Sequence, residues 1–380
     1  MDRFNNTDGD PDAALMRQAL AAAAQAIGLA EPNPRVGCVI ASEDGRVLGT
    51  GHTQRVGSAH AEIMALRDAQ ARGNALAGAT AYVTLEPCSH TGRTGPCCDA
   101  LIAAGVKRVV ASIQDPNPLV GGQGFARLRA AGVTVEVGAG AHESRALNLG
   151  FFSRMLRATP WVRMKAAASL DGTTALDNGE SQWITGQAAR ADGHAWRARA
   201  CAVLTGIGTV LEDNPRLNVR LDGATRQPQL VIVDSRLQTP ADAALFIDGR
   251  SVTIYAALRN PQREAELAAR GAHLVFMPGA APHNQAKVDL RAMLADLARR
   301  EVNELHVEAG HKLNGSLMRE SLVDEVLVYL APKLLGRGRG MLDLGPLSAL
   351  DQAVELEFIS SERVGVDLRV LARIAGREHF

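Results

Sequence analysis

The sequence lacks a net charge, a long basic run and any long apolar segment. Lys plus Arg and Asp plus Glu both number 41, so strong nonspecific attraction to nucleic acid is not indicated. No stretch is apolar for long enough to cross a bilayer, and residues 1–11 are polar and acidic, unlike a secretory signal. We therefore expect a soluble protein that acts on a small molecule and binds neither nucleic acid nor a membrane.

The five cysteines, two of them adjacent, do not resemble a disulfide framework. This usage favours a reducing compartment, and we expect the cytoplasm. Internal repeats and low-complexity segments are absent as well. A chain of 380 residues, 46% of them hydrophobic, is too long for one ordinary core and predicts two domains.

Three residues in the first part of the chain have the chemistry of a zinc site. They are His60, Cys88 and Cys97, and two thiols with one imidazole leave the fourth tetrahedral position of Zn²⁺ open to water. An open position is typical of a catalytic site rather than a structural one. Cys98 could replace Cys97 as a ligand, although only Cys97 directly follows a proline, as Cys88 does.

Glu62 stands two residues after the first candidate ligand. If His60 lies in the first turn of a helix that begins near Ala59, the Glu62 carboxylate projects into the same cavity. It can then shuttle a proton from zinc-bound water, whose pKa the metal lowers to about 7. Zinc deaminases combine a His-x-Glu pair with a Pro-Cys-x-x-Cys run. Here residues 89–96 separate the two cysteines, and this longer loop would be able to supply substrate contacts.

Two other classes of protein would use the same residues differently. A tRNA adenosine deaminase with an RNA-binding appendage is disfavoured by the zero net charge and by the long loop between the cysteines. A zinc-stabilised binding or regulatory protein would complete the coordination with four protein ligands and would have no use for Glu62. Hydrolytic deamination of a small molecule is therefore the favoured interpretation.

Strands and helices alternate along the whole chain. In the first part, helices are expected at 13–29, from Ala59 onward, at 97–104 and at 125–131, and strands at 36–40, 47–51, 81–85, 106–112 and 133–137. In the second part, strands are expected at 161–168, 202–205, 230–234, 251–255, 273–276, 304–308 and 325–330. The fold class is therefore α/β, and the first domain should be an α/β/α layered structure.

Glycine-containing turns at 206–209 and 310–316 follow two of the later strands. Both would present backbone N–H groups at a helix start, where phosphates bind. Neither matches the G-x-G-x-x-G fingerprint of dinucleotide-binding folds of the Rossmann type. The need for glycine in the backbone geometry of a turn explains them equally well.

Three motifs in the first part of the chain carry a family resemblance. They are Pro32-Asn33-Pro34-x-Val36-Gly37-Cys38-Val39-Ile40, His60-Ala61-Glu62 and the stretch 84–97. Together they resemble the deaminase half of the bifunctional riboflavin-biosynthesis deaminase/reductase family. The resemblance implies a cytidine-deaminase-like fold that acts on 2,5-diamino-6-ribosylamino-4(3H)-pyrimidinone 5′-phosphate. It also implies zinc ligands His60, Cys88 and Cys97, a catalytic proton shuttle Glu62, and substrate contacts from Asn33, His90 and Arg93.

The chain departs from this family pattern at two places. The family usually has Pro-Pro-Cys where Gly95-Pro96-Cys97 stands, and a histidine where Thr53 stands, with His52 one place earlier. We therefore assign no substrate role to Thr53 or His52.

Motifs at 164–172, 179–185, 208–215, 308–310 and 331–336 are similar to the reductase half of the same family. That half resembles dihydrofolate reductase in fold and uses NADPH to reduce the ribosyl group of the deaminated product to ribityl. The resemblance implies NADPH contacts from Ala167, Trp183, Thr209, Asp213 and the loop formed by Gly310, His311, Lys312, Leu313, Asn314, Gly315 and Ser316. It implies substrate contacts from Ser181, Arg197, Leu217, Arg220 and Glu308.

Two further expectations concern the reductase half. Two arginines among the substrate contacts suit a substrate phosphate. Lys165, on a strand expected to face the cleft, is either a contact at the sugar or a solvated lysine. We therefore expect a deaminase domain at 1–148, a linker at 149–158 and a reductase domain at 159–380, in a homodimer or higher homo-oligomer.

Overall fold

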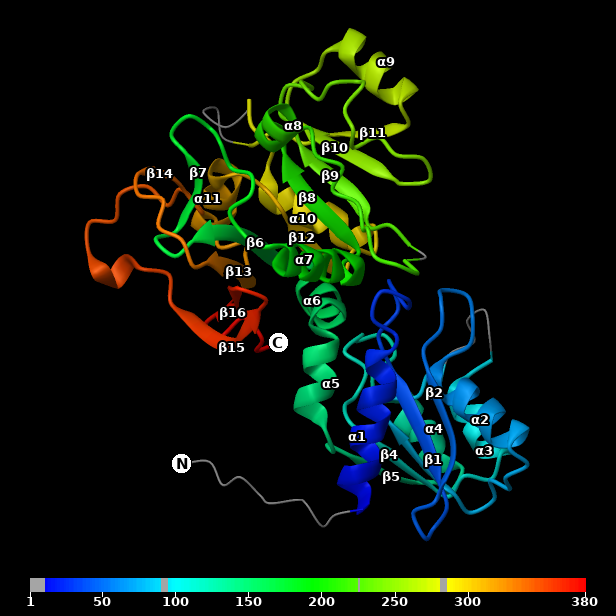
Figure 1. The fold of residues 1–380 in the computed structure, drawn as a ribbon. Coiled ribbons are helices and arrows are strands. Elements are labelled where there is room, and N and C mark those ends of the chain that lie inside the picture. The colour runs from blue at the N-terminus through cyan, green and yellow to red at the C-terminus, as the bar shows by residue number, and fades with distance from the viewer. Residues whose placement is uncertain (1–10, 90–94, 225, 281–285) are drawn as a thin grey trace. The chain divides into compact units, whose positions relative to one another are not determined.

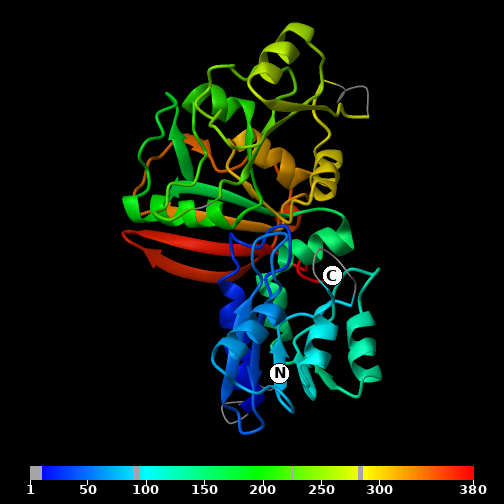
Figure 2. The same ribbon diagram turned by 90° about the vertical axis from the view of Figure 1, so that its right-hand side faces the viewer.

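The computed structural model describes residues 11–89, 95–224, 226–280 and 286–380. The chain divides into two compact units, Met1–Arg157 and Ala158–Phe380, whose ribbons are drawn in two views (Figure 1, Figure 2). Residues 149–158, expected to link the domains, contain helix α6 (Leu149–Arg157), which belongs to the first unit. In the described parts of the chain, no helix is both long and apolar enough to span a membrane.

The first unit is built around a five-stranded sheet with the order β2-β1-β3-β4-β5. Its strands are β1 (Gly37–Ala41), β2 (Val47–His52), β3 (Thr80–Val83), β4 (Arg108–Ala111) and β5 (Thr134–Val137). Strand β1 pairs antiparallel with both β2 and β3, whereas β3, β4 and β5 are parallel to one another. The expected hairpin and the expected parallel pairing of the later strands are confirmed.

Helices cover both faces of this sheet, as the α/β/α expectation requires. They are α1 (Pro11–Ala24), α2 (Ala61–Ala71), α3 (Cys97–Ala103), α4 (Gln123–Ala130) and α5 (Ala141–Leu147). Helices α1 and α5 lie on one face, and α2, α3 and α4 on the other (Figure 1).

Glycines in the hairpin let two helices approach the sheet closely. A Cβ on Gly37 would lie 1.9 Å from the carbonyl oxygen of Ala19 in α1. On the opposite face, a Cβ on Gly51 would lie 2.4 Å from the carbonyl oxygen of Ala61 in α2. Because Ala61 begins α2, this close contact fixes the position of the helix start that carries His60 and Glu62.

Two helix boundaries differ from the sequence expectation. The helix expected at 13–29 ends at Ala24, because the following N–H groups of Gln25 and Ala26 bond to the carbonyl three residues earlier rather than four. The helix expected from Ala59 begins at Ala61, so that His60 is its N-cap with an extended backbone. The spacing of the alanines predicts which face of residues 13–29 is buried, but it does not predict that the hydrogen bonds after Ala24 shift from four residues back to three.

The second unit contains a nine-stranded sheet with the order β11-β10-β9-β8-β12-β6-β13-β16-β15. Its strands are β6 (Trp161–Ser169), β8 (Ala202–Gly206), β9 (Gln229–Val233), β10 (Val252–Ala256), β11 (Ala272–Phe276), β12 (Glu304–Val307), β13 (Glu325–Ala331), β15 (Leu356–Val364) and β16 (Asp367–Ile374). The strands from β11 to β13 are parallel, and β16 runs antiparallel to both of its neighbours. A separate ribbon pairs β7 (Thr173–Leu176) with β14 (Gly338–Gly340).

Helices also cover both faces of the second sheet. They are α7 (Gln187–Arg199), α8 (Ile207–Asp213), α9 (Pro261–Ala269), α10 (Leu290–Arg299) and α11 (His311–Arg319), and a short 3-10 helix spans Leu350–Gln352. Apolar residues of α10 and α11 pack on one face, and those of α7, α8 and α9 on the other. A parallel sheet covered on both faces explains why its strands are near-continuous apolar runs.

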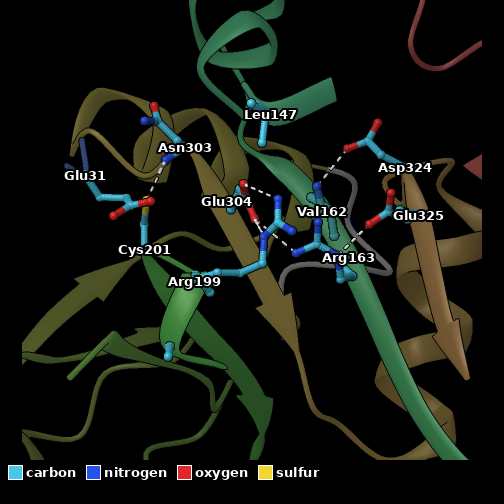
Figure 3. A network of polar contacts seen from close by, with 12 residues as sticks. Glu31, Leu147, Val162, Arg163, Arg199, Cys201, Asn303, Glu304, Asp324 and Glu325 are labelled. Atoms are coloured by element: carbon cyan, nitrogen blue, oxygen red, sulfur yellow. Dashed lines mark hydrogen bonds and ion pairs between the residues drawn. The ribbon is translucent and has the colours of Figure 1, made fainter. Parts of the chain in front are cut away.

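A buried network of charges ties the central strands of this sheet together (Figure 3). Arg163 of β6 is 3% exposed and pairs with Glu304 of β12 at 3.0 Å and with Glu325 of β13. Arg199 also pairs with Glu304 at 3.0 Å. Each buried charge has opposite charges beside it, which buried ions require. The network therefore fixes the register of β12, the strand that carries Glu308 at its end.

Candidate active sites

The first candidate site is formed by His60, Cys88 and Cys97. One ligand atom from each lies within 4.8 Å of the others: Nδ1 of His60 is 3.6 Å from Sγ of Cys88 and 3.4 Å from Sγ of Cys97. His60 precedes α2 and Cys97 begins α3, so the cluster lies between two helix starts, as expected. Two sulfurs and one imidazole nitrogen fit a tetrahedral zinc ion with one position left for a non-protein ligand.

Cys98 is not part of this cluster. Its Sγ lies 3.2 Å from the carbonyl oxygen of Pro87 and 3.5 Å from that of Gly124. Cys97 in contrast donates its backbone N–H to Sγ of Cys88 at 3.3 Å. The structure thus brings Cys97, and not Cys98, to the other two candidate ligands.

Glu62 lies in the first turn of α2 and is 3% exposed. Burial, with the negative charge of Cys88 beside it, raises the pKa of the Glu62 carboxyl to about 7. A hydrogen bond from Cys97 lowers the pKa of the Cys88 thiol, and His60 adds to the effect. The site thus combines a thiolate donor for a metal with a carboxyl group that can take up and release a proton.

The candidate substrate contacts of this site are only partly described. Asn33 is half-buried and donates its backbone N–H to the carbonyl oxygen of Ala30 at 2.9 Å. His90 and Arg93 lie outside the described residues. Thr53, where the family usually has histidine, is buried and accepts the backbone N–H of Val36 through Oγ1 at 3.1 Å. Thr53 therefore ties the end of β2 to the start of β1.

The second candidate site is centred on Glu308, which directly follows β12. Arg197 of α7 donates two hydrogen bonds to its carboxylate, and the Nζ of Lys165 on β6 lies 3.6 Å from Oε2. Burial alone would raise the pKa of Glu308, but Arg197 and Lys165 outweigh burial and hold the pKa well below its ordinary value. Lys165 is therefore part of an ion cluster rather than a solvated lysine.

Arg220 and Arg197 converge on one segment of the chain. Nη1 of Arg197 donates to the backbone carbonyl of Asn218 at 3.1 Å, and Nη1 of Arg220 to the side-chain oxygen of the same residue at 2.8 Å. Leu217, the residue before Asn218, is 6% exposed and packs in the apolar core. Any substrate contact of Leu217 would therefore come from its backbone. Ser181 is half-buried in the segment before α7.

Candidate NADPH contacts lie where α8 and α11 begin. These helices follow β8 and β12, which are neighbouring parallel strands. A Cβ on Gly310 would lie 3.7 Å from Oγ1 of Thr209, so the two helix starts are adjacent at the carboxyl edge of the sheet, where α/β proteins bind ligands. Ala167 lies on β6 beside β12, and Asp213 ends α8.

Trp183 is a largely exposed candidate NADPH contact. The residue is 64% exposed, and the guanidinium of Arg190 lies 4.5 Å from the centroid of its ring. Nζ of Lys333 donates to the Trp183 carbonyl oxygen at 3.1 Å. A large exposed aromatic surface held at its backbone is able to stack on a ligand ring.

The expected loop at 310–316 is a helix from His311 onward, with Gly310 as N-cap. Within it, Asn314 is buried and donates to the carbonyl oxygens of Ala309 and Met341, and Oγ of Ser316 donates to the Lys312 carbonyl. A Cβ on Gly315 would lie 2.0 Å from the carbonyl oxygen of Asp343. Asn314 and Gly315 thus pack inward, while the helix start that includes Leu313 adjoins α8. The sequence showed a glycine-rich segment but not which of its side chains pack inside.

Comparison with known proteins agrees with this two-site arrangement. Residues 10–113 match the family model for the cytidine and deoxycytidylate deaminase zinc-binding region, and residues 160–370 match the RibD C-terminal domain. The chain is 44% identical over 366 residues to riboflavin biosynthesis protein RibD of Escherichia coli, covering 94% of this chain and 98% of the relative. The relative from Aquifex aeolicus is 37% identical over 357 residues, covering 94% and 97%.

Two solved structures share the fold over nearly the whole chain. Acinetobacter baumannii RibD superposes with a TM-score of 0.86 at 38% identity, covering 96% of this chain and 98% of that one. A diaminohydroxyphosphoribosylaminopyrimidine deaminase/5-amino-6-(5-phosphoribosylamino)uracil reductase from Thermotoga maritima gives 0.84 at 30% identity, covering 96% and 99%. With a zinc-type donor set in one unit and an arginine-held carboxylate in the other, the chain belongs to the RibD family, bifunctional enzymes of riboflavin biosynthesis that join a zinc deaminase to an NADPH-dependent reductase.

Proposed function

We propose that this enzyme catalyses two consecutive steps, one in each unit. The first unit deaminates 2,5-diamino-6-ribosylamino-4(3H)-pyrimidinone 5′-phosphate, and the second reduces the ribosyl group of the product to give 5-amino-6-ribitylamino-uracil 5′-phosphate. The name of the Thermotoga maritima relative describes both reactions. The observation that carries the proposal is the convergence of His60, Cys88 and Cys97 beside the buried Glu62, apart from the Glu308 cluster of the other unit.

In the deamination step, His60, Cys88 and Cys97 hold a zinc ion. When bound, zinc activates a water molecule for hydrolysis by lowering its pKa to about 7. Glu62, buried beside the three donors, would accept a proton from the attacking water and donate a proton to the amino group that leaves. We assign the pyrimidine contacts to Asn33, His90 and Arg93.

In the reduction step, bound NADPH would supply the hydride, and the residues of the second unit would orient its nicotinamide against the sugar. The dinucleotide would be held by Ala167, Trp183, Thr209, Asp213 and the start of α11. Glu308 stays ionised and accepts hydrogen bonds from the sugar hydroxyls. Lys165, beside Glu308, places its ammonium group next to the sugar. Arg197 and Arg220 face the substrate phosphate, with Ser181 and the backbone of Leu217 nearby.

The Glu62→Ala variant separates the two activities. We expect it to release no ammonia from the diaminopyrimidine while it still oxidises NADPH with predeaminated substrate, because the Glu308 cluster is untouched. Ammonia and NADPH are followed separately on the purified full chain. Loss of both activities in a folded variant would contradict the division of labour, and ammonia release without any NADPH oxidation by the wild-type chain would remove the reductase assignment.

We also propose that the enzyme works in the cytoplasm as a homodimer or higher homo-oligomer. The five cysteines are free and four of them are buried, as expected in a reducing compartment. Strand β15 is one of the two edge strands of the second sheet and exposes Phe358 at 79%. An edge strand that exposes a large aromatic side chain is a surface that pairs readily with another strand, and in a symmetric oligomer that strand is β15 of a second copy.

A further inference from the structure

Glu86 is a buried carboxylate beside the candidate zinc ligands for which the proposed mechanism gives no role. It is 6% exposed and stands two residues before Cys88. Both of its oxygens accept backbone hydrogen bonds from a single distant segment: Oε2 from the N–H groups of Asp115 at 3.1 Å and Gly122 at 2.8 Å, and Oε1 from those of Gly124 at 2.8 Å and Phe125 at 3.2 Å.

These four donors lie in the loop before α4 and in its first turn. The N-cap of α4 is Gly122, with φ at 83° and no side chain to accept the free N–H groups of the helix start. Glu86, in the segment that follows β3, supplies that acceptor. Its negative charge suits the positive N-terminal end of a helix. Glu86 thus attaches α4 to the segment that carries Cys88.

The start of α4 in turn rests on the backbone next to Cys88. A Cβ on Gly124 would lie 2.0 Å from the carbonyl oxygen of Pro87, so only glycine allows this approach. The Cys98 side chain lies between Pro87 and Gly124, with its Sγ 3.2 Å from the carbonyl oxygen of Pro87 and 3.5 Å from that of Gly124. From α3, the N–H of Cys98 donates to the Cys88 carbonyl at 3.2 Å. The backbone around Cys88 is therefore enclosed between α3 and α4.

We propose that Glu86 is a positioning residue for the metal centre. By holding the start of α4 against Pro87, it fixes where the Cys88 sulfur stands relative to His60 and Cys97. The inference rests on the proposed assignment of these three residues as zinc ligands. Groups that orient metal ligands from outside change metal affinity by about 10–100-fold when they are replaced, and Glu86 acts in this way through the backbone.

The Glu86→Gln variant tests this role in the full chain. Glutamine keeps the size of the side chain, but its NH₂ group faces two N–H donors and cannot accept from them. We expect the dissociation constant for zinc, measured by competition with a chromogenic chelator, to rise about 10–100-fold. The absorption bands of the Co²⁺-loaded protein should shift as well. Glu136→Gln removes an exposed carboxylate of the same unit and should change neither quantity.

Thermal unfolding with and without zinc separates positioning from simple capping. If Glu86 only stabilises α4, its replacement should lower the melting temperature equally with and without zinc. If Glu86 positions a ligand, its replacement should also make the increase in melting temperature on adding zinc smaller, because that increase depends on zinc affinity. Should Glu86→Gln fail to fold, Gly124→Ala keeps the Glu86 charge but forces the Pro87 carbonyl, 2.0 Å from the new Cβ, and the Glu86 side chain, 3.1 Å from it, away from the start of α4, and we expect the same loss of affinity.

Two results would overturn the inference, and they differ from failure of the proposed function. Unchanged zinc affinity and an unchanged cobalt spectrum in a folded Glu86→Gln or Gly124→Ala variant would leave Glu86 as a helix cap only. If the wild-type chain takes up no stoichiometric zinc, or if Cys88→Ser binds zinc as tightly as the wild type, the ligand assignment itself is wrong and the inference falls with it.

Discussion

Two glutamates of this chain, the buried Glu62 and the half-buried Glu308, have pKa values shifted in opposite directions. Burial, together with Cys88, raises the pKa of Glu62 to about 7. Burial acts in the same direction on Glu308, but the charges of Arg197 and Lys165 prevail and lower its pKa. A carboxyl group that titrates near neutrality suits proton transfer, whereas one that stays ionised suits the binding of hydroxyl groups and cations. The opposite shifts thus suit the different tasks that we propose for the two carboxyl groups.

Replacing Glu308 by glutamine should impair reduction and leave deamination intact. The amide keeps the shape of the side chain but loses the charge that Arg197 and Lys165 face. Because a hydrogen bond to a charged group contributes about 1.5–3 kcal/mol, we expect NADPH oxidation on predeaminated substrate to fall about 10–100-fold. Ammonia release should keep its wild-type rate, and a parallel loss of both rates would contradict the assignment of Glu308 to the reductase site.

The stability cost of this Glu308→Gln change should depend on pH with a definite sign. The folded-state pKa of Glu308 lies below that of an unfolded glutamate, which is about 4.3. Its ionised form therefore stabilises the fold fully above that pH, and the contribution is lost as the pH falls through the folded-state pKa. Denaturant titrations should show the largest difference in unfolding free energy near neutral pH, and a difference that grew on acidification would be inconsistent with an ionised Glu308.

Spacing in the sequence was enough to find some site residues but not others. His60 and Glu62 are two residues apart on one helix start, so a local pattern places them together. The choice of Cys97 over Cys98 depends on α3 beginning at Cys97, which directs Cys98 toward Pro87. The bonds of Glu86 to a segment about thirty to forty residues later depend on tertiary packing, and no local pattern reports them.

At the scale of elements, the packing of α11 should control NADPH binding. Gly315 lies where α11 contacts the segment around Asp343, and a Cβ there would lie 2.0 Å from the Asp343 carbonyl oxygen. An alanine must therefore push the helix and the segment apart, and such overpacking costs about 1–3 kcal/mol. Because the start of α11 adjoins Thr209, we expect Gly315→Ala to raise the KM for NADPH more than it lowers kcat, and to lower the melting temperature.

Gly193→Ala in α7 is the matched control for this change. Apart from the chain neighbours of Gly193 and the backbone of its own helix, no atom of the described residues lies within 4 Å of a Cβ built on Gly193. Alanine should therefore stabilise the helix by about 0.5–1 kcal/mol and leave the KM for NADPH unchanged. Steady-state kinetics with varied NADPH and thermal unfolding of both variants give the comparison. An unchanged KM in Gly315→Ala would show that the position of α11 does not matter for the cofactor.

The elements that were predicted from sequence are those whose packing is visible locally. All seven strands expected between 161 and 330 are present, because parallel strands buried on both faces are short apolar runs. The hairpin of β15 and β16 was missed, because no residue of β15 is buried and its sequence has no apolar run. Its place in the sheet comes from pairing with β13 through β16, which is a long-range property.

At the scale of the whole molecule, each unit has its own sheet, its own apolar core and its own candidate site. In both units the site residues follow the ends of central parallel strands: Cys88 comes after β3, and Glu308 after β12. The same topological rule therefore serves two unrelated reactions, because parallel strands leave their carboxyl ends and the following helix starts at one edge. Chemistry is set by which side chains stand at that edge, and the sheet provides the frame.

The edge of the second sheet leads to a prediction about the assembly. Phe358 on the edge strand β15 is 79% exposed, and a twofold interface would bury the same side chain from each copy. Since burial of a phenylalanine contributes about 1.5–3 kcal/mol, Phe358→Lys should weaken self-association by several orders of magnitude. Light scattering should show an oligomer for the wild type and a shift toward the monomer mass for the variant. Leu119→Lys, which changes a side chain 78% exposed in the first unit, should keep the wild-type mass. A wild-type chain that is already monomeric, or a Phe358→Lys variant of unchanged mass, would show that β15 is not the surface that joins two copies.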